Sequence, residues 1–529
     1  MPSLLAYWPI AAGIAALYFF QKIWIEYSHR RRASALGCGP VYRRQGKLPF
    51  SVDQTYKAFR ALQDNEFLNL EVTTHQDLGR STFTQPNLGR DLLMTTDPEN
   101  VKALLATQFK DFGLGPMRLK ILEPLLGLGI FTSDGKDWQH SRAILRPQFT
   151  RTQISNLHVE EIHVQHLLNR FEHGANGWTK DVNLVPLFFN LTLDSATEFL
   201  FGKSVNTQVL GGPRAERTTT EKGSADEIED WSSFGRSFDN ANQTMTQRFL
   251  LMNLYFLHNP ASLQQSCAEV RRFADYYVRR ALARSPALAQ EEDGTDYVFL
   301  NELVKETRDP DVLRNQLLNI LLAGRDTTAG LLGWTTLRLA RQPEVYAKLR
   351  AAVLAAFGPY SASDTSRITF ESLKACTYVQ HVLSETLRLH PSVPTNFRHA
   401  LRDTTLPRGG GDDGQAPIYI RAGCNVLYST NVMHRRPDLW GPDADEFKPE
   451  RWENKKFGWE YLPFNGGPRI CLGQQFALTE AAYVLVRLVQ KYDAMENLDT
   501  SPTIKSNLTL TSSPIQTLVR LHEASDRVE

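Results

Sequence analysis

The stretch that is most informative about fold and function is Phe464-Asn465-Gly466-Gly467-Pro468-Arg469-Ile470-Cys471-Leu472-Gly473. Its glycines predict a tight loop, and the apolar periodicity of residues 474–489 predicts a helix directly after it. Cys471 stands where the free N–H groups of that helix begin, and their partial positive charge favours a thiolate over a thiol. The three glycines remove side chains where a bulky, flat partner would come close, and Arg469 offers a permanent cation to an anionic group. The stretch therefore predicts a thiolate that faces a flat partner carrying negative charge.

The same stretch fits the pattern Phe-x-x-Gly-x-Arg-x-Cys-x-Gly at every fixed position. It resembles the haem-binding loop of the cytochrome P450 monooxygenases. The resemblance implies that Cys471 is the axial thiolate ligand of a haem iron. It also implies that Phe464, Gly467, Arg469 and Gly473 bind the cofactor around that ligand, with Phe464 keeping water from the sulfur. A lone cysteine at a helix start is usually only a buried side chain, but a complete pattern is much more specific.

The longest helical pattern covers residues 311–339 and contains Ala323-Gly324-Arg325-Asp326-Thr327-Thr328. Its glycine and β-branched residues lower helix propensity and predict a local widening of the helix. An Asp–Thr pair inside a helix is usually solvated or bonded to its own backbone. The resemblance implies a different role, in which Thr327 supplies a hydroxyl and Asp326 an acid for proton delivery during oxygen activation.

Three further residues match positions that contact the haem propionates in this family. Trp138 and Arg142 lie four residues apart on a predicted helix and share a face, and Arg398 follows in an extended segment. Without the resemblance, the Trp–Arg pair would be only a cation–π contact. Arg142 also belongs to a basic run with Arg146 and Arg151, which we expect to face the electron donor.

An ion-pair network is expected between residues that are far apart in the sequence. Glu385 and Arg388 are spaced i, i+3 on one helix, and alone they would be a common surface pair of little energetic value. In the P450 family a Glu-x-x-Arg pair locks onto a second arginine downstream. Arg451 is that third member here, so the resemblance implies a structural role for all three.

The N-terminal region predicts a membrane anchor. Residues 4–25 are almost wholly apolar and long enough to cross a bilayer as a helix. The basic residues 29–32 and 43–44 follow this run and none precedes it, which predicts that the C-terminal side faces the cytosol. A cleaved signal peptide would carry its charge before the run, and a buried core helix is the remaining alternative. We expect a single-pass protein of the endoplasmic reticulum membrane, with an anchor at 1–28, a basic hinge at 29–49 that includes a Gly-Cys-Gly-Pro turn, and one catalytic domain at 50–529.

Several segments are candidates for the substrate pocket. Residues 112–116 and 124–129 read as a long apolar loop that either lines a ligand site or packs under a helix. Residues 231–258 are unusually apolar and aromatic, which fits either a lid that dips into the membrane or ordinary core, and the resemblance favours the lid. Residues 393–397 should border the pocket. Residues 211–230 are rich in Gly, Thr and charge and predict a flexible insert.

Composition limits the remaining possibilities. The chain has 529 residues, and 59 Lys and Arg against 58 Asp and Glu give a net charge of +1, which argues against a nucleic-acid partner. The five cysteines, at positions 38, 267, 376, 424 and 471, show no disulfide framework or zinc spacing and fit a reducing compartment.

The sequence as a whole predicts a mostly α protein with a smaller β region and the cytochrome P450 fold. Its motifs are similar to those of a fungal, membrane-bound group that hydroxylates alkanes and fatty acids. The resemblance implies that one atom of O2 enters a C–H bond of a lipophilic substrate. No flavin or nicotinamide fingerprint occurs, so the electrons should come from a separate NADPH-dependent reductase. Two kinds of alternative stay open: a tailoring monooxygenase of polyketide or terpenoid biosynthesis, and a haem–thiolate isomerase or dehydratase that needs no reductase. A haem-binding carrier or sensor would have no use for the proton-delivery pair.

Overall fold

The computed structural model describes residues 8–88, 90–150, 157–174, 176–210, 231, 233–283 and 297–525. The predicted insert at 211–230, Arg151 and the first residues of the predicted anchor lie outside this part of the chain. The longer helices of the body are α8 (His158–Leu168), α9 (Leu184–Phe201), α11 (Phe234–Leu250), α12 (Ala261–Ala283), α14 (Pro310–Arg341), α15 (Pro343–Phe357), α17 (Thr377–Leu389) and α20 (Gln474–Lys491).

The shorter helices are α2 (Val52–Gln63), α3 (Phe67–Leu78), α4 (Pro98–Lys102), α5 (Gly115–Leu126), α6 (Gly135–Leu145), α10 (Thr207–Leu210), α13 (Phe299–Glu306), α16 (Phe370–Ala375), α18 (Thr430–Met433) and α19 (Pro437–Trp440). Single helical turns occur at η2 (Pro49–Ser51), η3 (Ala103–Thr107), η4 (Phe109–Asp111), η5 (Arg146–Phe149), η6 (Met252–Leu257), η7 (Pro449–Trp452) and η8 (Gly467–Arg469). The mostly α fold class that the sequence predicts is therefore confirmed.

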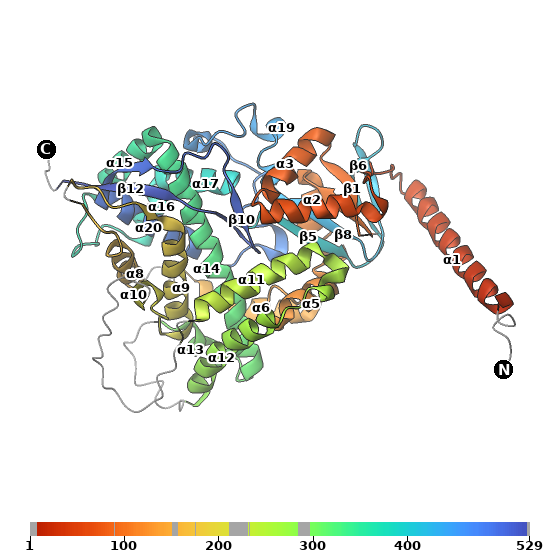
Figure 1. Ribbon diagram of the computed structural model, residues 1–529, viewed down its shortest axis with the longest axis horizontal. Coiled ribbons are helices and arrows are strands. Elements are labelled where there is room, and N and C mark those ends of the chain that lie inside the picture. Colours follow the sequence, from red (N-terminus) through yellow and green to blue (C-terminus); the bar gives the residue numbers. More distant parts are fainter. Residues whose placement is uncertain are drawn as a thin grey trace.

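The β region is small, and its main sheet lies next to α2 and α3, whereas β12 lies at the opposite end of the body near α15 (Figure 1). Its main sheet has the strand order β1-β2-β8-β5-β3, in which only β2 and β8 pair in parallel. These strands are β1 (Thr82–Asn87), β2 (Arg90–Thr95), β3 (Phe112–Gly113), β5 (Thr395–Ala400) and β8 (Asn425–Ser429). Smaller sheets join β6 (Thr404–Gly410) to β7 (Ala416–Ile420), β10 (Ser506–Leu508) to β11 (Ser512–Pro514), and β4 (Val182–Asn183) to β12 (Leu518–Glu523) and β9 (Tyr492–Asn497).

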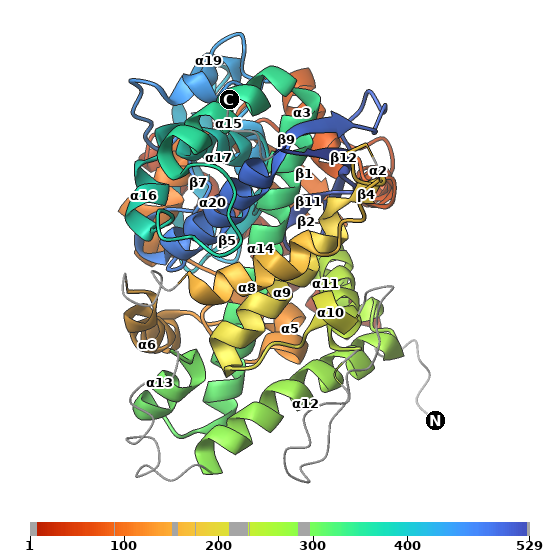
Figure 2. The same ribbon diagram turned by 90° about the vertical axis from the view of Figure 1, so that its left-hand side faces the viewer.

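Helix α14 runs through the body and contacts α5, α9, α12, α17 and α20 (Figure 2). It begins where the Asp309 carboxylate accepts hydrogen bonds from the N–H groups of Asp311 and Val312, with Pro310 in the first turn. It ends before Pro343, because the residue that precedes a proline disfavours helical backbone. The predicted widening near Thr327 is not seen, since the helix remains regular from Pro310 to Arg341.

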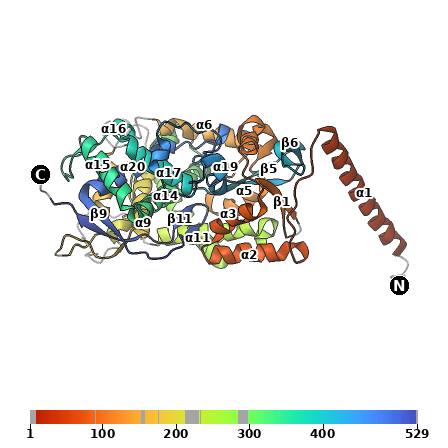
Figure 3. The same cartoon turned by 90° about the horizontal axis from the view of Figure 1, so that it is seen from above.

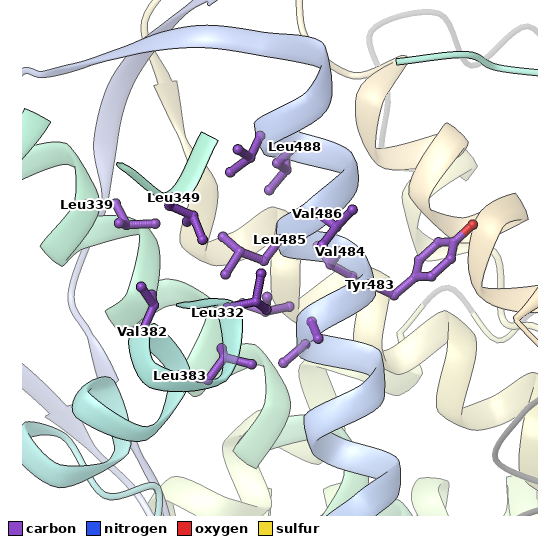
Figure 4. Close-up of a cluster of buried hydrophobic side chains, with 14 of the residues drawn as sticks. Leu332, Leu339, Leu349, Val382, Leu383, Tyr483, Val484, Leu485, Val486 and Leu488 are labelled. Atoms are coloured by element: carbon purple, nitrogen blue, oxygen red, sulfur yellow. The ribbon is translucent and has the colours of Figure 1, made fainter. Parts of the chain in front are cut away.

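The core on one side of α14 is formed by leucines and valines of four helices (Figure 4). Leu332 and Leu339 of α14 pack with Leu383 of α17 and Leu485 of α20, and all four are at most 1% exposed. Full burial of such a side chain stabilises the fold by about 1.5–3 kcal/mol. This packing fixes α20, and therefore the loop before it, against α14.

One expected loop is a helix. The segment 112–129 contains β3 and then α5, with Gly127 ending the helix in a left-handed conformation (φ 62°). Pro116 fits the first turn of α5, where its missing N–H is not needed. The prediction of a loop at 112–116 and 124–129 was therefore wrong for the residues of α5, although Arg118 and Leu122 of this helix do line cavities.

The N-terminal helix α1 (Trp8–Ala35) leaves the body and points away from it (Figure 3). Its large apolar side chains are exposed, among them Phe19 at 65% and Ile23 at 67%. Its C-terminal half is tied to the β6–β7 hairpin, because Glu26 pairs with Arg421 at 2.6 Å and Arg32 pairs with Asp403 at 2.7 Å. Among the described residues, one helix passes a length and composition test for a membrane span: α9, which is two thirds buried and belongs to the core.

Candidate active site

The loop around Cys471 places its sulfur on the wall of a cavity. The Cys471 N–H donates to the carbonyl of Phe464 at 3.0 Å, which closes the loop, and Gly473 starts α20. The cavity is lined by this loop and, from α14, by Ala323, Gly324 and Thr327. The expected arrangement of a cysteine and the threonine-bearing helix around one cavity is therefore present.

Cys471 is exposed, and it lines both this cavity and a surface hollow that it shares with Arg142, Arg146 and Pro468. Burial raises the pKa of the Cys471 thiol, while the N–H of Gly473 and the guanidinium of Arg142 act in the opposite direction. The helix start thus helps the thiolate, as the sequence predicts, but burial outweighs it.

Four arginines line the cavity, and we call three of them from separate segments, Arg118, Arg398 and Arg469, the arginine cluster. The Nε atom of each is buried and has no hydrogen-bond partner among the described residues. Burial lowers the pKa of Arg118 to about 9 and that of Arg469 to about 10, and each also feels the charge of Arg398. The acid paired with the cluster is Asp134, which accepts a hydrogen bond from Arg469 at 2.7 Å.

This cluster fits a dianionic ligand. Its three guanidinium groups, paired with the single carboxylate of Asp134, leave an excess of positive charge to which Arg142 adds. Unpartnered buried N–H groups are costly unless a ligand accepts from them. A haem supplies two propionates, and the thiolate of Cys471 is a suitable ligand for its iron. The residues present therefore fit a haem between the Cys471 loop and α14.

Trp138 and Arg142 share the predicted helix, α6, and both line the cavity. Arg142 donates to the carbonyl of Ile470 at 3.1 Å and lies 5.9 Å from the centre of the Trp138 ring. The Arg469 guanidinium packs closer, 4.4 Å from the same ring. The structure thus brings Trp138, Arg142, Arg398 and Arg469 together around one cavity, as the sequence predicts.

Two glycines of the loop make room for protein atoms, whereas the sequence predicts that they make room for a flat partner. A Cβ on Gly467, which has φ +67°, would collide with the carbonyl oxygen of Leu105 in η3. A Cβ on Gly466 would collide with the ring of Trp459 at 2.7 Å. Gly473 does line the cavity, and its Cβ would make only an ordinary contact, 3.5 Å from Phe149. Close approach to a flat partner is therefore not what Gly467 provides, whereas Phe464 lines the cavity as expected.

Thr327 and Asp326 face different surroundings. Thr327 lines the cavity, and its hydroxyl donates to the carbonyl of Ala323 at 2.6 Å. The Asp326 carboxylate is buried on the side of α14 that meets α11, where Asn242 donates to it at 2.9 Å and Arg325 at 3.1 Å. Burial raises the pKa of Asp326 to about 6, and Arg325 opposes this rise. Arg325 also pairs with Asp239, whose side chain is 58% exposed, so the network reaches the surface.

A second cavity forms an apolar channel of about 370 Å³ that reaches Thr327. Its walls come from α2, α3, β2, α5, α11, η6, α14, β5 and β8. Its apolar lining includes Phe67, Leu70, Leu92, Met94, Leu122, Phe131, Phe249, Leu250, Met252, Leu322, Val393, Phe397, Leu427 and Leu510. Residues 393–397 and part of 231–258 border this channel, as the sequence predicts.

Arg118 was missed by sequence reasoning, although it lines both cavities. It donates to the side-chain oxygen of Asn396 at 2.5 Å and stacks on Phe397, 4.5 Å from the ring centre. The sequence around it, Gly115–Leu126, also contains Lys120 and Glu123, so no local signal distinguished Arg118 from a surface residue. The partners of the Arg325–Asp326 pair could not be predicted from the local sequence. Asn242, which donates to Asp326, and Asp239, which accepts from Arg325, come from a helix more than 80 residues away in the sequence.

The family model described as "Cytochrome P450" matches residues 63–519 of the chain. Among curated relatives, "Cytochrome P450 monooxygenase g430" of Fusarium sp is 46% identical over 92% of this chain and 85% of that protein. "Cytochrome P450 52A13" of Debaryomyces hansenii is 45% identical over 94% and 93% of the two chains. "Cytochrome P450 52A4" of Candida maltosa is 49% identical over 80% and 78%.

A solved structure supports the same fold. The chain is similar to "Crystal structure of cytochrome P450DA heme domain", with a TM-score of 0.72, 22% identity, and coverage of 92% of this chain and 98% of that one. At this identity the likeness concerns the arrangement of helices and sheets.

Proposed function

The chain belongs to the cytochrome P450 family of haem–thiolate monooxygenases, and on that premise we propose that it hydroxylates a long lipophilic chain of the alkane or fatty-acid type. The observation that carries this proposal is the channel of about 370 Å³, which reaches Thr327 and whose accessible lining surface is mostly apolar. A mostly apolar site of this size suits a flexible hydrocarbon. The motif likeness to fungal alkane and fatty-acid hydroxylases agrees with it.

Cys471 is proposed as the thiolate ligand, with the arginine cluster, Trp138 and Arg142 around the propionates. The cofactor, when bound, supplies the chemistry that activates O2 and inserts one oxygen atom into a C–H bond, while the other atom leaves as water. The protein holds the substrate in the channel, neutralises the propionates and excludes water from the apolar walls.

Thr327 and Asp326 are proposed to move the protons. The Thr327 hydroxyl borders the cavity and can donate once its bond to the Ala323 carbonyl turns away. Asp326 has a raised pKa and a link through Arg325 to the exposed Asp239, so it can take up a proton from the surface side. We expect Thr327→Ala to bind substrate normally but to consume NADPH with release of hydrogen peroxide. Unchanged coupling of NADPH use to product would contradict this role.

The electrons are proposed to come from a separate NADPH-dependent reductase, which would dock near Arg142 and Arg146. Helix α1 is proposed as a single-pass anchor in the endoplasmic reticulum membrane, because its described large apolar side chains from Leu17 to Tyr27 are exposed. Deletion of residues 1–35 should then release the protein from membranes into the soluble fraction. The catalytic domain from residue 50 onward would face the cytosol.

A ligand panel tests the substrate. Full-length enzyme is titrated with fatty acids, alkanes and polyketide-like or terpenoid ligands while the haem absorbance is followed, and products are then analysed with reductase and NADPH. The proposal expects binding and hydroxylation of the fatty acids or alkanes. Turnover of only the polyketide-like or terpenoid ligands would instead favour a tailoring enzyme, and product without reductase would favour an isomerase or dehydratase.

A further inference from the structure

A carboxyl group lies in the wall of the otherwise apolar channel. Glu71 of α3 lines the channel and is only 6% exposed. Thr395 donates to its two carboxylate oxygens at 3.0 and 3.1 Å, and Ser429 donates to one of them at 2.9 Å. Burial raises the pKa of Glu71 to about 7, and the hydroxyls of Ser429 and Thr395 and the amide of Asn431 oppose this rise.

Within the described residues, no basic group compensates this acid. Its carboxylate partners are hydroxyl and amide groups, and charged neighbours do not contribute to its shifted pKa. The histidine one turn further along α3, His75, bonds through Nδ1 to the Glu71 carbonyl, and burial lowers its pKa to about 4, so it is neutral. Burying an acid without a basic partner in a mostly apolar wall lowers the stability of the fold. A functional role for Glu71 would account for its presence.

Glu71 lies toward the inner part of the channel. Its partner Thr395 is three residues from Ser392, and the Ser392 hydroxyl donates to the Thr327 carbonyl at 3.2 Å. Three residues of extended chain span at most about 10 Å. Three arginine and lysine residues line the channel. Arg118 lies at its boundary with the Cys471 cavity, beside Asn396 and Phe397, whereas Arg44 precedes α2 and Lys57 belongs to α2 and is exposed to solvent.

We propose that Glu71 is a specificity-determining residue that selects which end group of a chain substrate enters the inner channel. This inference rests on the proposed function. A hydrocarbon end or a hydroxyl passes the site, because the hydroxyl can donate to a carboxylate oxygen, and a cationic end is attracted. A carboxylate is repelled, so a fatty acid enters with its tail first and its carboxylate stays near Arg44 and Lys57.

The test uses four chain acids that differ at the far end, with full-length haem-loaded enzyme at pH 8.5, above the pKa of about 7 of Glu71, and dissociation constants from equilibrium dialysis. Two carry a charge: dodecanedioic acid and 12-(trimethylammonio)dodecanoic acid, whose quaternary nitrogen cannot bind iron. Their neutral counterparts are monomethyl dodecanedioate and 13,13-dimethyltetradecanoic acid. The dissociation constant of each charged acid is divided by that of its neutral counterpart. On this relative scale the wild-type enzyme should bind the cationic acid about tenfold more tightly than the diacid, a difference of about 1.4 kcal/mol.

Glu71→Gln should remove this preference, because the amide keeps the shape and can still accept from Thr395. Glu66→Gln is the matched control, since Glu66 starts the same helix and pairs with Lys505 at the surface. Equal rejection of both charged ends by the wild type, which needs no variant, would overturn the inference, as would a preference that survives in Glu71→Gln. Failure of dodecanoic acid itself to bind would instead overturn the proposed function.

Discussion

Gly467→Ala tests whether the loop that carries Cys471 is fixed by the protein or by the cofactor. The left-handed backbone at Gly467 (φ +67°) costs an alanine about 1–2 kcal/mol. Its Cβ would also collide with the backbone carbonyl of Leu105, which cannot turn aside as a flexible side chain can. Relief of such overpacking adds about 1–3 kcal/mol. We therefore expect about 2–5 kcal/mol of destabilisation, a large share of the stability of a typical domain.

The measurement is urea unfolding of the full-length protein, followed by tryptophan fluorescence, together with the haem content of each purified variant. Gly414→Ala is the matched control, because Gly414 has a similar φ of +71° and nothing within 4 Å of its Cβ position. It isolates the backbone cost, so Gly467→Ala should be less stable than Gly414→Ala by the cost of the collision. Equal midpoints for the two variants would refute the packing of η8 against η3.

Other substitutions probe the site and its supports. Cys471→Ala should abolish the red-shifted carbon monoxide spectrum of a thiolate-ligated ferrous haem, and a normal spectrum in this variant would refute the ligand assignment. Glu385→Ala should cost about 3–5 kcal/mol in urea unfolding, because it leaves the fully buried Arg388 without its carboxylate; a loss below about 1 kcal/mol would show that the pair is dispensable. The folded state raises the pKa of Asp326 to about 6 from an ordinary value near 3.8, so this group stabilises the fold fully below pH 3.8 and loses that contribution as the pH rises through 6. The wild type should therefore gain stability relative to Asp326→Asn between pH 7 and pH 5, and a difference that is flat with pH would contradict the burial of an ionisable group there.

Local signals in the sequence were enough to predict the helices and the loop at the centre of the site. Asp309 and Pro310 mark the start of α14, and the loop pattern identifies Cys471 and the helix after it. The ion pair of Glu385 and Arg388 and its third member Arg451, 3.4 Å from Glu385, were also predictable, because each belongs to a motif of known spacing.

Features that depend on a distant neighbour were not predictable. A glycine is required at position 467 because a Cβ there would collide with the carbonyl oxygen of Leu105, which lies more than 350 residues earlier in the chain. The role of Glu71 depends on hydroxyls of β5 and β8, which pair with each other far from α3 in the sequence. A residue type and its immediate neighbours predict local conformation, but its environment is decided only when separate elements pack together.

The channel and the haem cavity share one wall, and this sharing links substrate position to cofactor binding. Thr327 of α14, Arg118 of α5 and Asn396 of β5 line both cavities. The Arg118–Asn396 hydrogen bond holds α5 against β5 at the boundary, and the Nε of Arg118 has no hydrogen-bond partner among the described residues. A substrate chain that fills the channel would therefore pack against a side chain that we propose to neutralise a propionate. With Glu71 in the wall of the same channel, the proposed selection of the far end of a chain acid and the binding of the cofactor would depend on neighbouring side chains of α3, α5 and β5.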